Sequence, residues 1–114
     1  MAIEVQEFSG IATSSPLDTS VGASTTGTAA ASGSLSPAGA GELLVGMVAG
    51  HANAQTMTVT STGFTVQPQQ NSTGTIASVR TGYRLLPDTT PTGFNASFTT
   101  AMYWAAGIVA FKPR

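Results

Sequence analysis

Hydrophobic and polar residues alternate with a period of two over much of the chain. In residues 79–85, Val79 and every second residue after it would face one side of a half-buried strand, and Arg80 and Arg84 would face the other side. Residues 94–98 repeat the alternation with Phe and Ala between polar residues. This period is typical of strands with one face buried and one face exposed. We therefore predict strands at both places, with the two arginines on an exposed face.

Two longer apolar runs predict strands of the core. Residues 42–50 contain seven consecutive residues without a polar side chain, from Leu43 to Ala49. A run of that length is typical of a central strand that is buried on both faces. Residues 102–112 form the second run, and we expect them to be the last strand of the core.

The remaining pattern is weaker but still favours strands. Residues 3–8 alternate and predict a strand near the start. Residues 27–35 are small and polar, and we favour a strand over a flexible linker there. Residues 57–66 predict two short strands, because Ser-Thr-Gly at residues 61–63 is typical of a hairpin turn.

The fold class that follows is all-β. Helical periodicity is missing, and the alanine triplet at residues 29–31 lies among Gly, Ser and Thr, which interrupt a helix. About eight antiparallel strands at this spacing indicate a single β-sandwich domain over residues 1–114, with jelly-roll-like connections. An immunoglobulin-like sandwich is the alternative, although it usually has a Cys-Trp-Cys core and this chain has no cysteine.

Charged residues are scarce, and this limits the classes of partner that the chain is expected to bind. Only 8% of residues are charged and the net charge is −1, against about 25% charged residues in an average soluble domain. Without a basic patch, nucleic-acid binding is not expected. Polarity comes from Ser and Thr, so little charge repulsion opposes self-association. The run at residues 101–111 is too short to span a bilayer, and the first residues do not resemble a signal peptide, so no membrane partner is expected.

Residues that carry catalytic chemistry are few. His51 is the only histidine, cysteine is absent, and the five carboxylates are scattered along the chain. Neither a Gly-x-Ser-x-Gly elbow nor a phosphate-binding glycine loop occurs. We therefore expect a non-enzymatic protein without catalytic residues, metal site or cofactor.

Candidate contacts with a partner lie in three places. Tyr103 and Trp104 are adjacent in a predicted strand, so one should fill the core and the other should face outward, as a sugar-stacking platform or a subunit contact. The arginines of residues 79–85 are a second candidate, and a polar loop is the third. The candidate residues are Tyr103, Trp104, Arg80, Arg84, Gln67, Gln69, Gln70 and Asn71.

Several phrases of the sequence resemble a known group of proteins. Glu-Phe-Ser-Gly followed by Pro-Leu-Asp, within residues 7–18, resembles a phrase in β-rich modules that occur in tandem in bacterial surface proteins and singly as small phage virion proteins. The resemblance extends over nearly the whole chain. The other segments that carry it are residues 33–35, 41–46, 63–65 and 104–113.

The resemblance implies a structural role. A phage decoration or cement protein would sit on the virion surface, associate as homo-oligomers such as trimers, and contact the major capsid protein. The alternative is a repeat module of an extracellular bacterial adhesin, or a carbohydrate-binding module at the cell surface with a glycan as its partner. In that alternative the aromatic pair and the polar loop are the first candidates for ligand contact.

Overall fold

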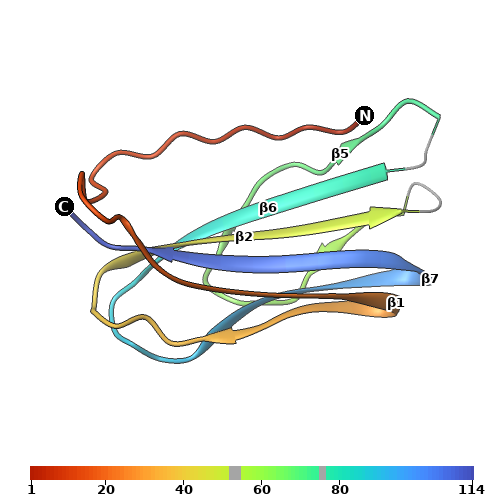
Figure 1. Ribbon diagram of the computed structural model, residues 1–114. Coiled ribbons are helices and arrows are strands. Elements are labelled where there is room, and N and C mark those ends of the chain that lie inside the picture. The colour runs from red at the N-terminus through yellow and green to blue at the C-terminus, as the bar shows by residue number, and fades with distance from the viewer. Residues whose placement is uncertain (52–54, 75–76) are drawn as a thin grey trace.

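The computed structural model describes residues 1–51, 55–74 and 77–114, and it is all-β in these ranges (Figure 1). No helix occurs among the described residues, and therefore none long and apolar enough to cross a membrane. All strand pairings are antiparallel. The seven strands are β1 Leu17–Leu35, β2 Glu42–His51, β3 Thr58–Val59, β4 Thr65–Val66, β5 Gln70–Asn71, β6 Ala77–Leu86 and β7 Thr92–Phe111.

One sheet forms both layers of a sandwich because its two longest strands bend. The strand order is β1-β7-β2-β6-β4, with β3 added to β7 and β5 added to β6. Residues 19–27 of β1 pair with residues 102–110 of β7, next to β2 and β6, and this is the larger layer. The second half of β1 and the first half of β7 pair beyond the bend and form the smaller layer with β3. Figure 1 shows both strands turning back on themselves at the same end of the molecule.

The bend in β7 is held by a glutamine from outside the strand. The buried Gln55 side chain accepts a hydrogen bond from Thr100 N at 2.7 Å and donates one to Thr100 O at 2.9 Å. It also accepts one from Thr99 Oγ1 at 3.1 Å. An amide side chain therefore replaces the strand partner that the backbone lacks at the bend. This explains why residues 94–98 and 102–112, predicted as two strands, belong to one strand.

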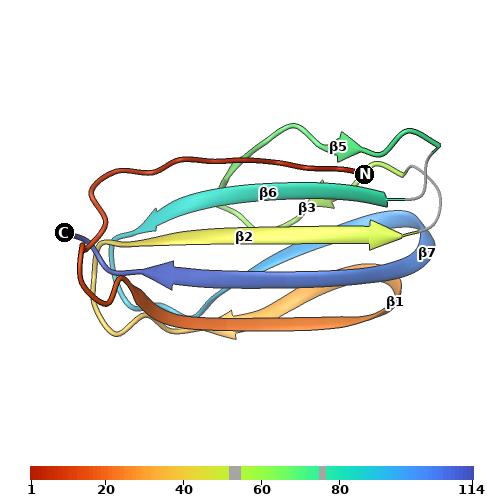
Figure 2. The ribbon, with the colours of Figure 1, turned by 45° about the horizontal axis from the view of Figure 1, so that its top comes forward.

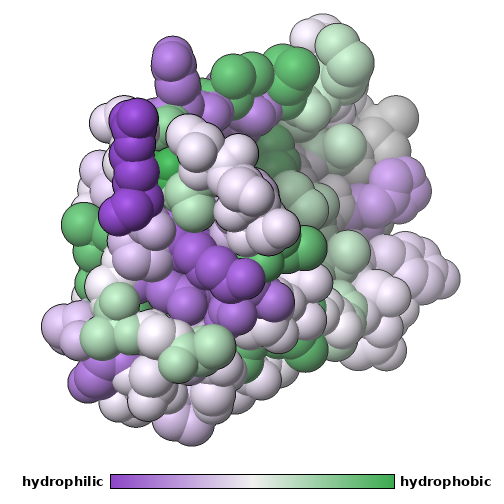
Figure 3. Space-filling model, turned by 60° about the vertical axis from the view of Figure 1, so that its left-hand side comes forward, coloured by the Kyte–Doolittle hydropathy of each residue, from purple (hydrophilic) through white to green (hydrophobic). Residues whose placement is uncertain are grey.

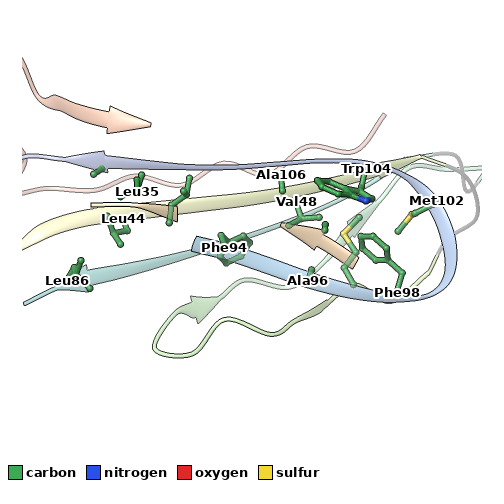
Figure 4. Close-up of a cluster of buried hydrophobic side chains, with 14 residues drawn as sticks. Leu35, Leu44, Val48, Leu86, Phe94, Ala96, Phe98, Met102, Trp104 and Ala106 are labelled. Carbon is green, nitrogen blue, oxygen red and sulfur yellow. The ribbon is translucent and has the colours of Figure 1, made fainter. Parts of the chain in front are cut away.

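The core lies between the two layers and is shown in Figure 4. Phe94 of the smaller layer is 0% exposed and lies opposite Gly46 and Gly82 of the larger layer. An added Cβ at Gly46 would lie only 2.3 Å from Phe94 Cγ, so these strands need glycine to accommodate the ring. Phe64 packs edge-on against Phe94, with 5.0 Å between ring centroids. The other large side chains that are fully buried are Leu44, Val48, Met57, Leu86 and Met102.

The segment from β3 to β4 crosses between layers and does not form the predicted hairpin. β3 pairs with β7, and β4 pairs with β6. Ser61 Oγ donates to Gly93 O and accepts from Asn95 N, both at 2.9 Å, and Thr60 N donates to Asn95 O at 2.9 Å. The turn at residues 61–63 is therefore a corner of the sandwich, and the hairpin prediction is wrong.

The segment at residues 1–9 is extended, but it is not a strand of the sheet. It runs along β6 over the face of the larger layer that points away from the core (Figures 1 and 2). The predicted strand at residues 3–8 is thus wrong for this chain taken alone.

The all-β sandwich itself is confirmed, with seven strands where about eight were expected. The linker alternative is wrong for residues 27–35, because they lie in β1, which begins ten residues earlier than predicted.

Candidate partner-binding surface

The outward-pointing side chains of β2, β6 and β7 form an apolar surface, which we call the outer face. Residues paired across strands share a face, so the pairing of Val45 with both Tyr83 and Val109 places all three on this face. Three of its side chains are well exposed: Met47 at 45%, Leu85 at 69% and Tyr103 at 65%. The apolar side chains of the outer face include Leu43, Val45, Met47, Ala49, Val79, Tyr83, Leu85, Tyr103, Ala105, Val109 and Phe111, and the polar Thr81 and His51 lie among them.

A shallow groove of about 570 Å³ lies at one end of the outer face. Met47, Val79 and Tyr103 line it together with small alanines, and Ala2 of the extended segment lies at its rim. His51 also lines it, because it is the exposed last residue of β2 and pairs with Tyr103. The groove has mostly apolar walls, as surfaces that bind protein partners often have.

The aromatic pair is divided between the core and the surface, as predicted from its adjacency. Trp104 is 8% exposed and belongs to the core, while Tyr103 is 65% exposed on the outer face. Figure 4 shows the Trp104 indole among the buried side chains. Trp104 is therefore not available as a surface contact, whereas Tyr103 remains a candidate.

The side chains of Gln69 and Asn71 in the polar loop form hydrogen bonds within the chain. Gln69 accepts a hydrogen bond from Met57 N at 2.7 Å and donates to Gln55 O at 2.6 Å. Asn71 Oδ1 accepts from Gln69 Nε2 at 2.8 Å and from Ser78 Oγ at 2.6 Å. Gln69 therefore attaches the loop to the chain just before β3, and Asn71 attaches it to β6.

Gln67 and Gln70 differ from each other in the same loop. Gln67 uses its backbone, since its N–H donates to Thr81 O at 2.9 Å and its carbonyl accepts from Arg80 Nε at 3.1 Å. Gln70 is exposed, and its side chain makes only a long contact of 3.3 Å to Pro68 O. Of the four predicted loop residues, Gln70 has the side chain most available to a ligand.

The two arginines share one face of β6, but the prediction that this face is exposed is wrong. Arg80 pairs with Val48 and Arg84 with Leu44, and both of these partners are fully buried. Arg80 Nη1 donates to Met57 O at 2.7 Å, in addition to its bond to the loop. Arg80 therefore connects β6 to the backbone of the crossing segment, which gives it a structural role.

Arg84 lies in a second hollow, at the opposite end of β6. The hollow has a volume of about 260 Å³ and is also lined by Asp88 and Thr92. Arg84 Nη1 lies 3.5 Å from Thr62 O. The N–H of Thr90 donates to the Asp88 carboxylate at 2.9 Å, and this bond lowers the pKa of Asp88. A cation and an anion therefore share this hollow.

Folding also brings together two of the scattered carboxylates. Glu42, at the start of β2, is 2% exposed and accepts a hydrogen bond from Gly39 N at 3.1 Å. Asp18 interacts with it and accepts from Ala38 N at 2.8 Å. Burial raises the pKa of Glu42, the Gly39 N–H opposes this rise, and the negative charge of Asp18 adds to it. The spacing of these residues along the sequence did not indicate their proximity.

We expect Glu42→Gln to stabilise the protein at pH 7 by about 1 kcal/mol, the scale of one hydrogen bond. The folded state holds the Glu42 proton more tightly than the unfolded state, whose pKa is near the ordinary value of 4.5. The contribution of Glu42 to stability is therefore full below pH 4.5, and it falls as the pH rises from 4.5 through the raised pKa of the folded state. Urea unfolding between pH 4 and 8 should show this decline in the parent and a flatter profile in the variant. Glu7→Gln, which removes an exposed carboxylate, is the matched control.

No known protein helps to identify the surface, since comparisons with family models, curated proteins and solved structures found no match. Within the described residues, no three His, Cys, Asp or Glu side chains lie close enough together to hold a metal ion.

Sequence reasoning missed the exposure of Met47 and Leu85. The apolar run around Met47 resembled a strand buried on both faces, and no local signal separates it from one whose outer face is open.

Proposed function

We propose that this protein is a non-catalytic structural module that works through protein–protein contacts of its outer face. The observation that carries the proposal is the exposure of Met47, Leu85 and Tyr103 on the outer face, beside the segment at residues 1–9. Exposed apolar area of this kind is costly in water, and a partner that covers it gains free energy. Large, stiff side chains such as Tyr are also the type that dominates binding energy at interfaces.

The setting that we propose is the surface of a phage virion, with the chain acting as a decoration or cement protein. Support comes from the sequence resemblance, above all at residues 41–46 and 104–113, and from the scarcity of charge. Copies would associate with one another, as trimers, and with the major capsid protein. Many repeated contacts of moderate strength would then stabilise the shell.

The test uses the purified protein and empty capsids of the phage whose genome carries the gene. We expect the chain to co-sediment with the capsids. Met47→Glu and Tyr103→Glu should each weaken binding by about 2 kcal/mol, or about thirtyfold in Kd, because a charge would be buried at the contact. Thr58→Glu adds the same charge at an exposed position of the smaller layer and should leave binding unchanged. A chain that stays monomeric and does not bind these capsids would refute the proposal.

The second candidate function is a glycan-binding module of a bacterial surface protein. The observation that favours it is the exposed Tyr103 ring beside His51 in an open groove, since sugars stack on exposed aromatic rings. Binding to a glycan array that is lost in Tyr103→Ala, with an unchanged circular dichroism spectrum, would support this function. Binding that persists in Tyr103→Ala would argue against this groove as the glycan site.

A further inference from the structure

The extended segment at residues 1–9 has the pattern of a strand without the pairing of one. Its even-numbered side chains turn toward the outer face, while Met1, Ile3 and Val5 are 96%, 64% and 82% exposed. No backbone hydrogen bond joins these nine residues to any other residue that the structure describes. Figure 2 shows the segment beside β6 as a plain trace. Its backbone donors and acceptors are therefore available to another chain.

Only a few side chains hold the segment in place. The Phe8 ring packs edge-on against Tyr83, with 5.3 Å between centroids. Gln6 Nε2 donates to Thr81 Oγ1, which in turn donates to Glu4 Oε1. The second oxygen of Glu4 and the amide oxygen of Gln6 are buried without a hydrogen-bond partner in the described residues. Buried polar atoms of this kind weaken a contact, so the segment can leave its place at little cost.

The outer edge of β1 presents a complementary set of unpaired backbone groups. β1 is the last strand of the sheet, and no other strand of the described residues covers its free edge. Residues 19–27 pair with β7 without a register shift, so this part of the edge is regular. It contains no charged residue and no proline, the usual devices that stop an exposed edge from pairing.

The core side of this edge is open. Ala23 pairs with Ala106 and Thr25 pairs with Trp104, and both of those partners are buried in the core. Ala23 and Thr25 point the same way but are exposed, because nothing beyond the edge covers them. A strand added at this edge would place alternate side chains beside Ala23 and Thr25, on the core side of the sheet. Ile3 and Val5 are apolar and have the required spacing of two residues.

The segment cannot reach the edge of its own copy while its attachment to the end of β7 is intact. Arg114 N donates to Gly10 O at 2.8 Å, and Ala12 N donates to Lys112 O at 3.0 Å. Lys112 N donates to Pro16 O at 2.8 Å. These bonds direct the segment over β6, which two strands, β7 and β2, separate from β1. The acceptor edge must therefore belong to a second copy.

We propose that residues 1–9 of one copy pair as a strand with residues 19–27 of β1 in a second copy. The contact is heterologous, because a donor segment of one copy meets an acceptor edge of the next. Such contacts continue from copy to copy and close into a ring when the rotation between copies allows it. The pairing involves copies of this chain alone and does not depend on what the outer face binds.

The experiment separates the donor from the acceptor. Val5→Pro removes a backbone N–H from the donor. Val5 is 82% exposed and makes no hydrogen bond to any of the described residues, so the fold is kept. Ala23→Lys places a charge on the core side of the acceptor edge. Sedimentation velocity should show assembly of the parent chain and the monomer mass of 11.4 kDa for each variant alone. An equal mixture of the variants should give a species of twice that mass, since one supplies the donor and the other the free edge.

The controls and the contrary outcomes are specific. Val5→Thr keeps the N–H and the β-branch, and Thr13→Lys adds the same charge in the loop before β1, so both should assemble like the parent. Thr25→Lys repeats the acceptor test if Ala23→Lys does not fold. The proposal is overturned by a parent chain that stays monomeric at every concentration. It is equally overturned by assembly that survives Val5→Pro, as edge-to-edge pairing of β1 would, or by variants that do not combine.

Discussion

Phe94→Ala is expected to lower the free energy of unfolding by about 3–5 kcal/mol, the range for removing a fully buried aromatic ring. The Phe94 ring is 0% exposed and fills the space that Gly46 and Gly82 leave between the layers. Those glycines have no side chains that could move into the cavity. Phe64 packs edge-on against the ring and does not fill the space that the ring occupies. The resulting cavity therefore stays open, and the loss should fall at the upper end of the range.

Equilibrium unfolding in urea measures this loss, with an unchanged m-value as the sign that the unfolding transition is still two-state. Phe111→Ala is the matched control, because it removes the same ring from a partly exposed position on the outer face. We expect it to cost less than half as much. A loss below about 1 kcal/mol for Phe94→Ala would mean that the layers close over the cavity, contrary to a core that depends on this ring.

The fold class could be predicted because the central strands obey local rules. Residues 42–50 and 79–85 alternate or stay apolar over seven or more residues, and both are strands with nearly the predicted bounds. The edge strand β1 was underestimated, since its first half is exposed on both faces and so shows no alternation. Its length follows from pairing with β7, a contact between residues far apart in the sequence.

The errors share a physical cause, which is that the sheet folds over itself. Alternation is interrupted at residues 99–101, where β7 passes from one layer to the other, and an interrupted pattern predicts two strands. Of the two short strands within residues 57–66, β3 belongs to the smaller layer and β4 to the larger one. The turn residues between them do not indicate this division. Arg80 and Arg84 suggested an exposed face because charged residues seldom point inward. Here the crossing segment supplies a carbonyl at Met57 that satisfies Arg80.

The candidate surface was predicted only in part, for the same reason. The division between Tyr103 and Trp104 follows from strand geometry and is confirmed. Which side of the sheet is open depends on where the second layer lies, and the sequence pattern does not specify this. The segment at residues 1–9 has the period of a strand, and none of the residues in the described ranges offers it a backbone partner. A strand that pairs between copies would show this combination, because its sequence alternates like a strand while its backbone partner belongs to another molecule.

Gly46→Ala is expected to have the second large effect, a loss of about 2–3 kcal/mol from overpacking. The new methyl group would lie 2.3 Å from Phe94 Cγ and 2.6 Å from its Cβ. Both atoms are close to the β7 backbone, so only a displacement of the strand could relieve the clash. Gly50→Ala is the matched control in the same strand. Its methyl group would meet the Sδ and Cε atoms of Met102 and the Cε atom of Met57, which are the ends of flexible side chains and can move at a lower cost than a strand.

Combining the two core changes tests whether the clash is the cause. In the Phe94→Ala protein the methyl group of Gly46→Ala enters the cavity instead of meeting a ring. Gly46→Ala should then be neutral or stabilising, since alanine also restricts the unfolded chain more than glycine does. The two substitutions should therefore couple by about 2–3 kcal/mol in a double-mutant cycle measured by urea unfolding. Simple additivity would show that Gly46 is required for a reason other than the Phe94 ring, and the packing between the layers would need a different explanation.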